Sequence, residues 1–272
     1  MVVPLRFSAV DDSGSRLSFY RESPPPADLS DAIRCTWEGT PGWTRALRLL
    51  PDGCVDIAWD GRRLVVVSAG AAPMRFGLSA AGSSVGVRLR CGAAGGLLGP
   101  RFATDSASLM DLNDLVLTGT RIVDDLHAAP TPAVRRALLA RFVARRLRDG
   151  FQPDPVMLAA ARALAAPDAR TDVVADRLGV SVRTLRRRVH EAVGCGPKAL
   201  HRVLRFHRFL RHLGDLAAGR TTLSSVAAEL GFADQSHLGH ECLSMSGSSP
   251  TQLVHGYARH AGVAETNQTA RP

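Results

Sequence analysis

The most distinctive chemistry in the sequence is a group of arginines between residues 183 and 188. The group consists of Arg183, Arg186, Arg187 and Arg188, with no acidic residue among them. The window 177–211 contains ten basic residues and one acid, a net of +9 that equals the net charge of the whole chain. Guanidinium groups pair bidentately with phosphate and with the guanine edge. The cluster therefore predicts a polyanionic partner.

Two short helices separated by a tight turn are expected to position these arginines. The first is expected at 172–178, with Gly179 in the turn. The second, the first reading helix, is expected at 182–192 with Ser181 as its N-cap. Its apolar residues recur at a spacing of four, so they face the preceding helix and leave the arginines outward. This is the helix-turn-helix layout, whose second helix enters the major groove of DNA.

The same layout recurs about 52 residues later in the chain. Helices are expected at 223–230 and at 235–245, the latter being the second reading helix, with Asp234 as its N-cap. Each unit closes with the pattern Gly-x-x-Pro, at 194–197 and at 247–250. A single helix-turn-helix pattern is weak, but two with matching closures are a specific indication of this architecture.

A linking helix is expected between the two units, from Lys198 to Leu213, ended by Gly214. Its 16 residues span ~24 Å at 1.5 Å per residue. A rod of that length is suited to hold two units roughly one DNA turn, ~34 Å, apart.

The part of the chain before the helical region is rich in glycine, valine and turn signals. Strands are expected at 54–59, 64–68 and 85–90, and short strands with frequent turns favour a small sandwich or barrel. Residues 1–30 are polar and contain three consecutive prolines, which indicates an arm or loop.

Helical signals begin after this β-rich zone. Thr131 followed by Pro132 opens a helix that ends at Gly150, and residues 152–155 are the best linker. Another helix is expected at 156–166.

The helical region resembles the DNA-binding domain of the AraC/XylS family of bacterial transcription regulators, over about residues 155–255. The matching residues are Ala175, Ser181-x-Arg183-x-Leu185-x-Arg187, Gly194-x-x-Pro197, Arg205, Ala227, Gly231-Phe232-x-Asp234-x-Ser236-x-x-Gly239 and Gly247-x-x-Pro250. The N-terminal zone resembles one branch of the same family, which has a small β-rich sensor domain, through Arg48 to Trp59, Val85 to Leu89 and Leu97-Leu98-Gly99.

The resemblance implies which side chains face the bases. By position they are Arg183, Arg186, Arg187, Gln235, Ser236 and His240. The chain departs from the family pattern at His240, where arginine is usual, and at Val189 and Cys242, where phenylalanine is usual. The second reading helix therefore carries no arginine or lysine, and the first unit is expected to specify the sequence while the second positions the protein.

Contacts to the DNA backbone are expected from a second, less specific set of residues. These are Arg188, Lys198, Arg202 and Thr222, which lie on or near the helix termini and faces that would meet phosphates. Arg205 is expected instead to pair inside the fold.

Enzymatic and metal-binding alternatives find little support in the residue types. The five cysteines are scattered and odd in number, and are expected to be reduced core residues. Residues 1–126 contain no histidine, so no metal site and no cofactor is expected in the β-rich zone. Asp52 and Asp60 suit turns, and no catalytic residue is assigned. Arg48, Trp59 and Arg88 are weak candidates for an effector site.

The sequence as a whole predicts an α+β protein: a cupin-like or small-barrel β-rich N-terminal domain, then an all-α domain with two helix-turn-helix units joined by a linking helix. The expected domains are 1–127 for sensing or dimerisation, 128–152 as connecting helix and linker, 153–255 for DNA binding, and 256–272 as tail. No membrane span or signal peptide is evident, so a cytoplasmic, nucleoid-associated bacterial protein is expected.

The predicted function is a sequence-specific regulator that binds double-stranded promoter or operator DNA and is not an enzyme. Its control is expected from an unidentified small effector or from homodimerisation, and RNA polymerase is a possible partner. Two alternatives remain open: an alkyl-transfer repair enzyme fused to a DNA reader, and a helical adaptor that binds protein. Scattered cysteines disfavour the first, and a salt-dependent affinity for DNA would exclude the second.

Overall fold

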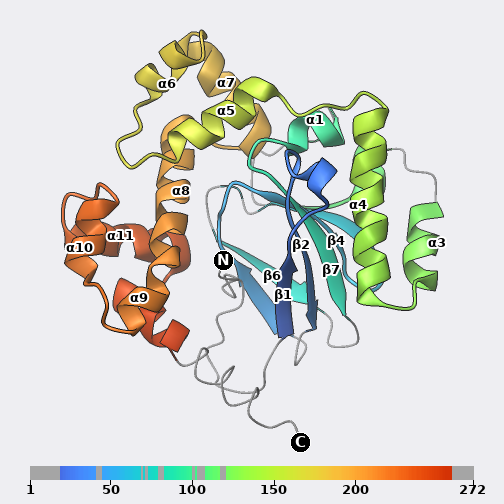
Figure 1. The fold of residues 1–272 in the computed structure, drawn as a ribbon, viewed down its shortest axis with the longest axis horizontal. Helices are drawn as coiled ribbons and strands as arrows, with labels where there is room; N and C mark the ends of the chain where they lie inside the picture. Colours follow the sequence, from blue (N-terminus) through green and yellow to red (C-terminus); the bar gives the residue numbers. More distant parts are fainter. Residues whose placement is uncertain are drawn as a thin grey trace, which may run out of the picture.

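The structure is a computed structural model of the 272-residue chain. It describes residues 19–40, 45–68, 70, 73–78, 83–99, 102, 108–116 and 121–258. A β-rich N-terminal domain lies beside a helical C-terminal region, and the α+β class is as predicted (Figure 1).

Within the described residues the β-rich domain contains a large antiparallel sheet and a small ribbon. The large sheet has the strand order β1-β2-β7-β4-β5-β8, and β3 pairs with β6 in the ribbon. The strands are β1 (Phe19–Ser23), β2 (Ile33–Thr40), β3 (Arg45–Leu49), β4 (Val55–Trp59), β5 (Leu64–Ser68), β6 (Met74–Leu78), β7 (Ser84–Leu89) and β8 (Ser108–Asp111).

The predicted hairpin is present as β4 and β5. Its turn is held by Asp60, whose Oδ1 accepts from the backbone N–H groups of Arg62 and Arg63 at 2.8 and 2.7 Å. Gly61 in this turn has a φ of +95°, a conformation that glycine adopts without strain. The strand expected at 85–90 is β7, shifted by one residue.

Alternation along β4 separates the two faces of the large sheet. Val55, Ile57 and Trp59 belong to the main core, in which helix α4 (Pro132–Arg148) covers the sheet. Asp56 and Ala58 alternate with them and so point to the opposite face. Because of this alternation, the charged side chain of Asp56 lies on the face of the large sheet that α4 does not cover.

The predicted helices occur in the predicted order. A short 3-10 turn, η1 (Ala27–Leu29), lies near the start. Helices associated with the β-rich domain are α1 (Ala94–Leu98), α2 (Leu112–Leu115), α3 (Arg121–Ala128) and α4. The remaining helices are α5 (Pro155–Leu164), α6 (Thr171–Arg177), α7 (Val182–Val193), α8 (Pro197–Arg211), α9 (Leu213–Ala217), α10 (Leu223–Glu229) and α11 (Gln235–Ser246), and residues 250–258 are also helical. The structure thus adds α1, α2, α3, α9 and a helix at 250–258 that were not expected from the sequence.

Two predictions about element boundaries are wrong. Residues 19–23 are not part of an arm, because they form the edge strand β1, which pairs with β2. Gly214 does not end the linking helix: α8 ends at Arg211, and Gly214 lies inside α9. A Cβ at Gly214 would lie 3.1 Å from Tyr257 Oη, so the absent side chain serves packing and not helix termination.

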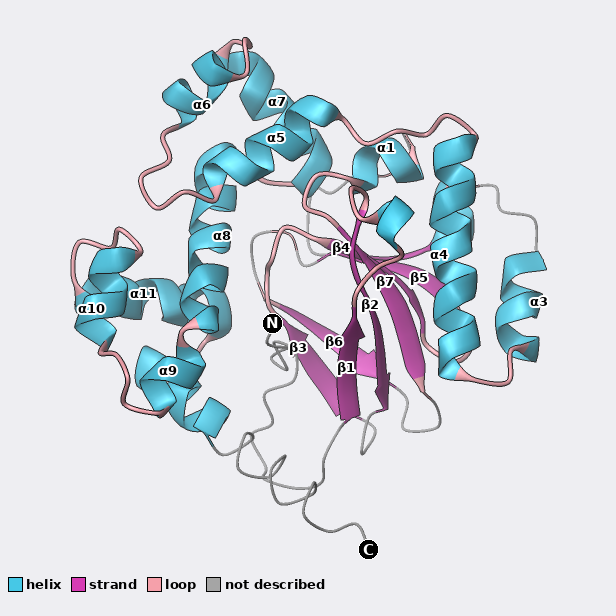
Figure 2. Cartoon of the chain, in the orientation of Figure 1, coloured by secondary structure: helices cyan, strands magenta, loops and turns pink. Residues whose placement is uncertain are grey.

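The two halves of the molecule are packed together, and α8 lies between the helix-turn-helix units (Figure 2). Glycines of the β-rich domain permit the close approach. A Cβ on Gly92 would lie 2.6 Å from Met157 Cγ of α5, and one on Gly96 would lie 2.0 Å from the carbonyl oxygen of Gln152. A bulkier residue at either position would push the domains apart.

No helix in the described part of the chain is both long enough and apolar enough to cross a bilayer.

Candidate nucleic-acid interface

The first helix-turn-helix unit consists of α6 and α7, as predicted. The Ser181 hydroxyl caps α7 by accepting from the Thr184 N–H at 3.1 Å, and Gly194 closes the helix in the left-handed conformation. Leu185 and Val189 are fully buried against α5 and α6. Because these two residues fix the rotation of α7, they decide which side chains face outward.

The three arginines predicted to face the bases lie together on the exposed face of α7. Arg183, Arg186 and Arg187 are exposed, and Arg186 and Arg187 follow Arg183 by three and four residues, which places them on one side of the helix. Arg187 donates to both carboxylate oxygens of Glu191, at 3.0 and 3.2 Å. Arg183 and Arg186 have no ion pair with any residue that the structure describes. Two uncommitted guanidinium groups are thus available to an anion.

Arg188 has a different environment from its neighbours. Its Nη1 donates to both oxygens of Asp154, at 3.1 and 2.9 Å. The same carboxylate caps α5 by accepting from the backbone N–H of Val156 at 2.9 Å. Arg188 therefore ties the first reading helix to the start of α5. Lys198, by contrast, is exposed in the first turn of α8.

The second unit consists of α10 and α11 and repeats the same construction. Asp234 caps α11 by accepting from the His237 N–H at 2.7 Å. Gln235, Ser236 and His240 are all exposed, while Leu238 and Cys242 are fully buried. The predicted base-facing trio of this unit therefore also shares an outward surface.

Thr222, predicted near phosphate, acts in the structure as the N-cap of α10. Its Oγ1 accepts from the Ser225 N–H at 3.2 Å and lies 2.9 Å from the Ser225 hydroxyl. The residue remains exposed at the helix start.

The linking helix α8 holds both units through side chains directed inward. His201 Nδ1 lies 2.9 Å from the carbonyl oxygen of Leu164, and Arg208 donates to that of Ala165 at 2.7 Å, so both satisfy the C-terminal end of α5. Toward the second unit, Arg205 donates to the Gly231 carbonyl at 3.2 Å, and its guanidinium lies 4.2 Å above the centre of the Phe232 ring. The expectation that Arg205 pairs inside the fold is confirmed.

Sequence reasoning missed the partner of Arg202. Its Nε donates to both oxygens of Glu241, at 2.9 and 3.1 Å. Glu241 is buried on the side of α11 that faces α8. The residues are 39 apart in sequence, so no local spacing signalled the pair.

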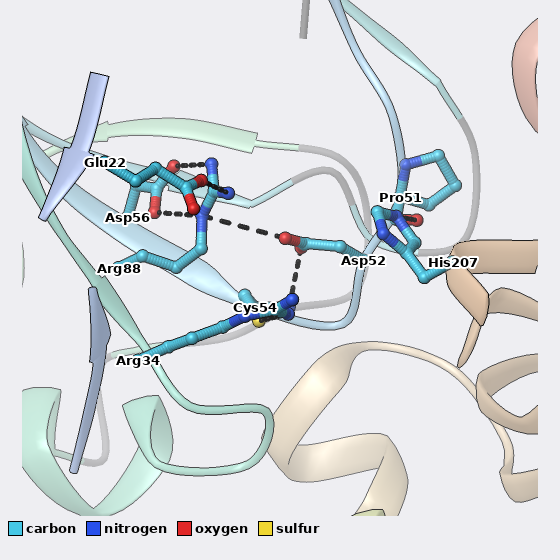
Figure 3. Close-up of polar contacts among 8 residues, drawn as sticks. All are labelled: Glu22, Arg34, Pro51, Asp52, Cys54, Asp56, Arg88 and His207. Atoms are coloured by element: carbon cyan, nitrogen blue, oxygen red, sulfur yellow. Dashed lines mark hydrogen bonds and ion pairs between the residues drawn. The ribbon is translucent and has the colours of Figure 1, made fainter. Parts of the chain in front are cut away.

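The β-rich domain contains a half-buried charge cluster on the face of the sheet opposite to the main core (Figure 3). Arg88 of β7 pairs bidentately with Asp56 of β4, at 2.9 and 3.0 Å. It also donates to Glu22 of β1 at 3.2 Å and lies 3.7 Å from Asp52. Asp56 and Arg88 are direct cross-strand partners in the register of β4 and β7, which accounts for the bidentate geometry.

Burial and charge act in opposition on the two aspartates of this cluster. Burial raises the pKa of Asp56 despite the opposing guanidinium of Arg88. For Asp52, burial also acts upward, but Arg88, His207 and Arg34 together hold its pKa below the usual value. Asp52 Oδ1 additionally accepts from the Cys54 N–H at 2.8 Å, the turn role expected for it.

The three effector candidates do not converge. Arg88 lies in the charge cluster, while Trp59 is 1% exposed in the core on the other face, with its ring edge-on to His127 at 4.7 Å. The side chain of Arg48 lies outside the described residues.

In the part of the chain that the structure describes, no three His, Cys, Asp or Glu side chains gather as a metal site. Burial raises the pKa of Cys54 to about 12 and also that of Cys35. Four of the five cysteines are buried, and Cys91 is half-buried.

The turn between β3 and β4 contacts the linking helix. His207 Nε2 donates to the Pro51 carbonyl at 2.8 Å (Figure 3). Leu50 is buried within the core of the second unit. A Cβ on Gly53 would lie 2.9 Å from Cδ1 of Leu200, a residue in the core of the first unit. One turn of the N-terminal domain therefore contacts the cores of both units.

Two family models match separate parts of the chain. Residues 174–255 match a family model described as a helix-turn-helix domain, and residues 21–106 match one described as a domain of unknown function (DUF6597). No curated protein matches the chain at a significant level.

Among solved structures, the chain is similar to ToxT of Vibrio cholerae. One structure of an apo ToxT variant has 14% identity over 88% of this chain and 96% of ToxT, with a TM-score of 0.41. A second crystal form has 11% identity over 87% and 98%, with a TM-score of 0.44. A third, of ToxT bound to an unsaturated fatty acid, has 11% identity over 88% and 94%, with a TM-score of 0.41.

The family match assigns residues 174–255 to the helix-turn-helix domains, the class of DNA-binding domain whose two-unit arrangement the structure contains in this part of the chain.

Proposed function

We propose that the chain reads a specific double-stranded DNA site with α7 and α11 and that its N-terminal domain controls this reading. The observation that carries the proposal is the outward face of α7, where Arg183 and Arg186 have no ion-pair partner among the described residues. Unpaired arginines on a reading helix suit bidentate contact with guanine. The outward residues of α11 are neutral and suit a positioning role.

Phosphate contacts are proposed for Lys198, which is exposed at the start of α8, and for Thr222 at the start of α10. Arg188 supports the first unit through Asp154, so its loss should act on the orientation of α7. We extend the proposal to the setting of the protein: it forms a homodimer, contacts RNA polymerase and is located at the bacterial nucleoid in the cytoplasm.

Control by the N-terminal domain rests on the β3–β4 turn. This turn joins a strand of the ribbon to a strand of the large sheet, and it contacts α8 through Pro51. Because Leu50 packs with the second unit and Gly53 against the first, a shift of the turn changes how the units lie relative to one another. An effector that favours one position of the turn would favour one spacing of DNA half-sites.

The proposal predicts a steep salt dependence of DNA affinity for the full chain. If about six phosphates are neutralised, log K should fall linearly with log salt with a slope of roughly −5. Titration of a fluorescent duplex, selected from a random library, at several salt concentrations measures the slope. A flat response, or no binding at low salt, contradicts the DNA-reading proposal and favours the protein-binding adaptor.

A repair enzyme fused to a DNA reader remains the second candidate. An alkyl-transfer centre needs a nucleophilic thiolate, and burial raises the pKa of Cys54, Cys195 and Cys242 above the ordinary value. The raised pKa values disfavour this alternative at these positions.

A further inference from the structure

The second reading helix carries a buried carboxylate that a DNA-facing helix would not be expected to contain. Glu241 is 8% exposed and lies in α11 beside the fully buried Cys242. Segment 234–246 contains two acidic residues, Asp234 and Glu241, and no arginine or lysine. Asp234 is engaged as the N-cap, so Glu241 is the acidic residue that α11 buries against α8.

Arg202 of α8 neutralises this carboxylate. Its Nε donates to both oxygens of Glu241, and the Arg202 side chain is 38% exposed against 10% for that of Glu241. A buried carboxylate without a partner is strongly unfavourable, so the pair resists separation. His237 is more distant, with its Nε2 3.9 Å from Glu241 Oε1. Arg202 is thus the strongest partner that the structure gives Glu241.

Arg202 also completes a two-point attachment of the second unit to α8. Arg205, one turn further along α8, holds the turn between α10 and α11 through the Gly231 carbonyl and the Phe232 ring. Arg202 holds α11 itself. Two attachments on different parts of the unit fix its rotation as well as its position, and rotation decides whether Gln235, Ser236 and His240 face the groove.

We propose that Arg202 is a positioning residue that acts through Glu241: it orients the second reading helix and cancels its negative charge, and it is not a phosphate contact. The inference rests on the proposed function, and it replaces the phosphate role expected for Arg202 from the sequence. A neutral pair at these two positions should therefore serve DNA reading nearly as well as the ion pair.

The test is a double-mutant cycle in the full chain, with Arg202→Gln, Glu241→Gln and the variant carrying both. Dissociation constants are measured on the selected duplex and on a scrambled one over a range of salt. Arg202→Gln should weaken binding to the selected duplex by about tenfold or more, since it leaves Glu241 buried without the guanidinium that holds α11 in its orientation. Glu241→Gln should lower the ratio of selected to scrambled affinity, because Arg202 loses the partner that orients α11.

The double variant discriminates between the two roles. If Arg202 acts through Glu241, the double variant should recover to within about threefold of the wild type and regain its salt slope, because two glutamines can hydrogen-bond and the net charge is unchanged. If Arg202 contacts phosphate, the affinity should stay low and the magnitude of the slope should fall by about 0.9. The second outcome overturns the inference.

Two further variants serve as controls. Arg211→Gln removes an exposed charge from the same helix, and Glu241→Gln should not rescue its effect. Arg202→Lys keeps the charge but loses the double contact, so it should fall between the wild type and Arg202→Gln. A wild-type chain that binds no DNA contradicts the proposed function, whereas a wild type that binds DNA with additive losses contradicts only the role of Arg202.

Discussion

Individual arginines in this chain serve two distinct purposes that their residue type does not reveal. On α7, Arg183 and Arg186 extend outward without an ion pair among the described residues. Arg88 instead compensates the half-buried carboxylate of Asp56, and Arg202 the buried carboxylate of Glu241. The difference depends on which way each helix or strand turns its side chains. A guanidinium that already pairs with a carboxylate shielded from solvent is not available to bind DNA.

The outward arginines should contribute more to sequence reading than the outward residues of α11. Arg183→Ala should cost ~1–3 kcal/mol on the selected duplex and flatten preference at one or two base pairs. His240→Ala should cost less than ~1 kcal/mol, because an imidazole cannot make the bidentate contact with guanine that a guanidinium makes. Affinities on selected and scrambled duplexes provide the comparison. Loss of specificity in His240→Ala, with Arg183→Ala unaffected, would reverse the assignment of roles.

At the scale of elements, glycines determine how closely the β-rich domain approaches the DNA-binding helices. Gly92 has a φ of +86°, and a Cβ there would lie 2.6 Å from Met157 Cγ of α5. Gly61 in the β4–β5 hairpin has a comparable φ of +95° but open space around it. The two glycines thus share a backbone requirement and differ in what surrounds them.

This pair allows packing to be separated from backbone strain. Gly61→Ala should lower the free energy of unfolding by about 1 kcal/mol, the cost of a positive φ for alanine. Gly92→Ala should lose a further ~1–3 kcal/mol, because Met157 must move. Chemical denaturation measures the difference, and hydrogen exchange should increase in α5 for Gly92→Ala alone. If both variants lost the same free energy of unfolding, the contact between Gly92 and Met157 would not be tightly packed.

For the whole molecule, the contact between the β3–β4 turn and α8 joins the N-terminal domain to both reading units. His207 contributes its Nε2–H to Pro51, and its Nδ1 is buried without a hydrogen-bond partner in the described part of the chain. Burial lowers the pKa of His207 to about 4, against an opposing influence of Asp52. The contact between His207 and Pro51 therefore favours the neutral form of the imidazole.

This contact should weaken as pH falls. The unfolded imidazole binds its proton near pH 6.5 and the folded one only near pH 4, so the stability present above pH 6.5 is lost progressively between those values. The free energy of unfolding should therefore drop between pH 7.5 and pH 5, by up to ~1.4 kcal/mol per pH unit in that window. Urea denaturation at both pH values measures the drop.

His207→Asn should reduce this pH dependence, since asparagine does not titrate between pH 5 and pH 7.5. His255→Asn, at an exposed position in the final helix, is the matched control and should retain it. An unchanged pH dependence in His207→Asn would exclude this histidine as its source.

The sequence by itself determined the elements whose signals are local. Ser181 and Asp234 cap the predicted helices, the β4–β5 hairpin occurs where its turn residues lie, and apolar spacing placed Leu185 and Leu238 inward. These features depend on interactions between residues within a few positions of one another, so a short stretch of sequence is enough to predict them. The outward face of α7 could be predicted for the same reason.

Only the tertiary structure decided which charged groups compensate one another and where the domains meet. Arg202 and Glu241 are 39 residues apart, and His207 and Pro51 are 156 apart. Gly214 has the residue type of a helix end, but the side chain of Tyr257 occupies the space beside it. Such contacts arise when separate elements pack, and the free energy of a buried charge or a missing Cβ depends on the neighbours that packing supplies.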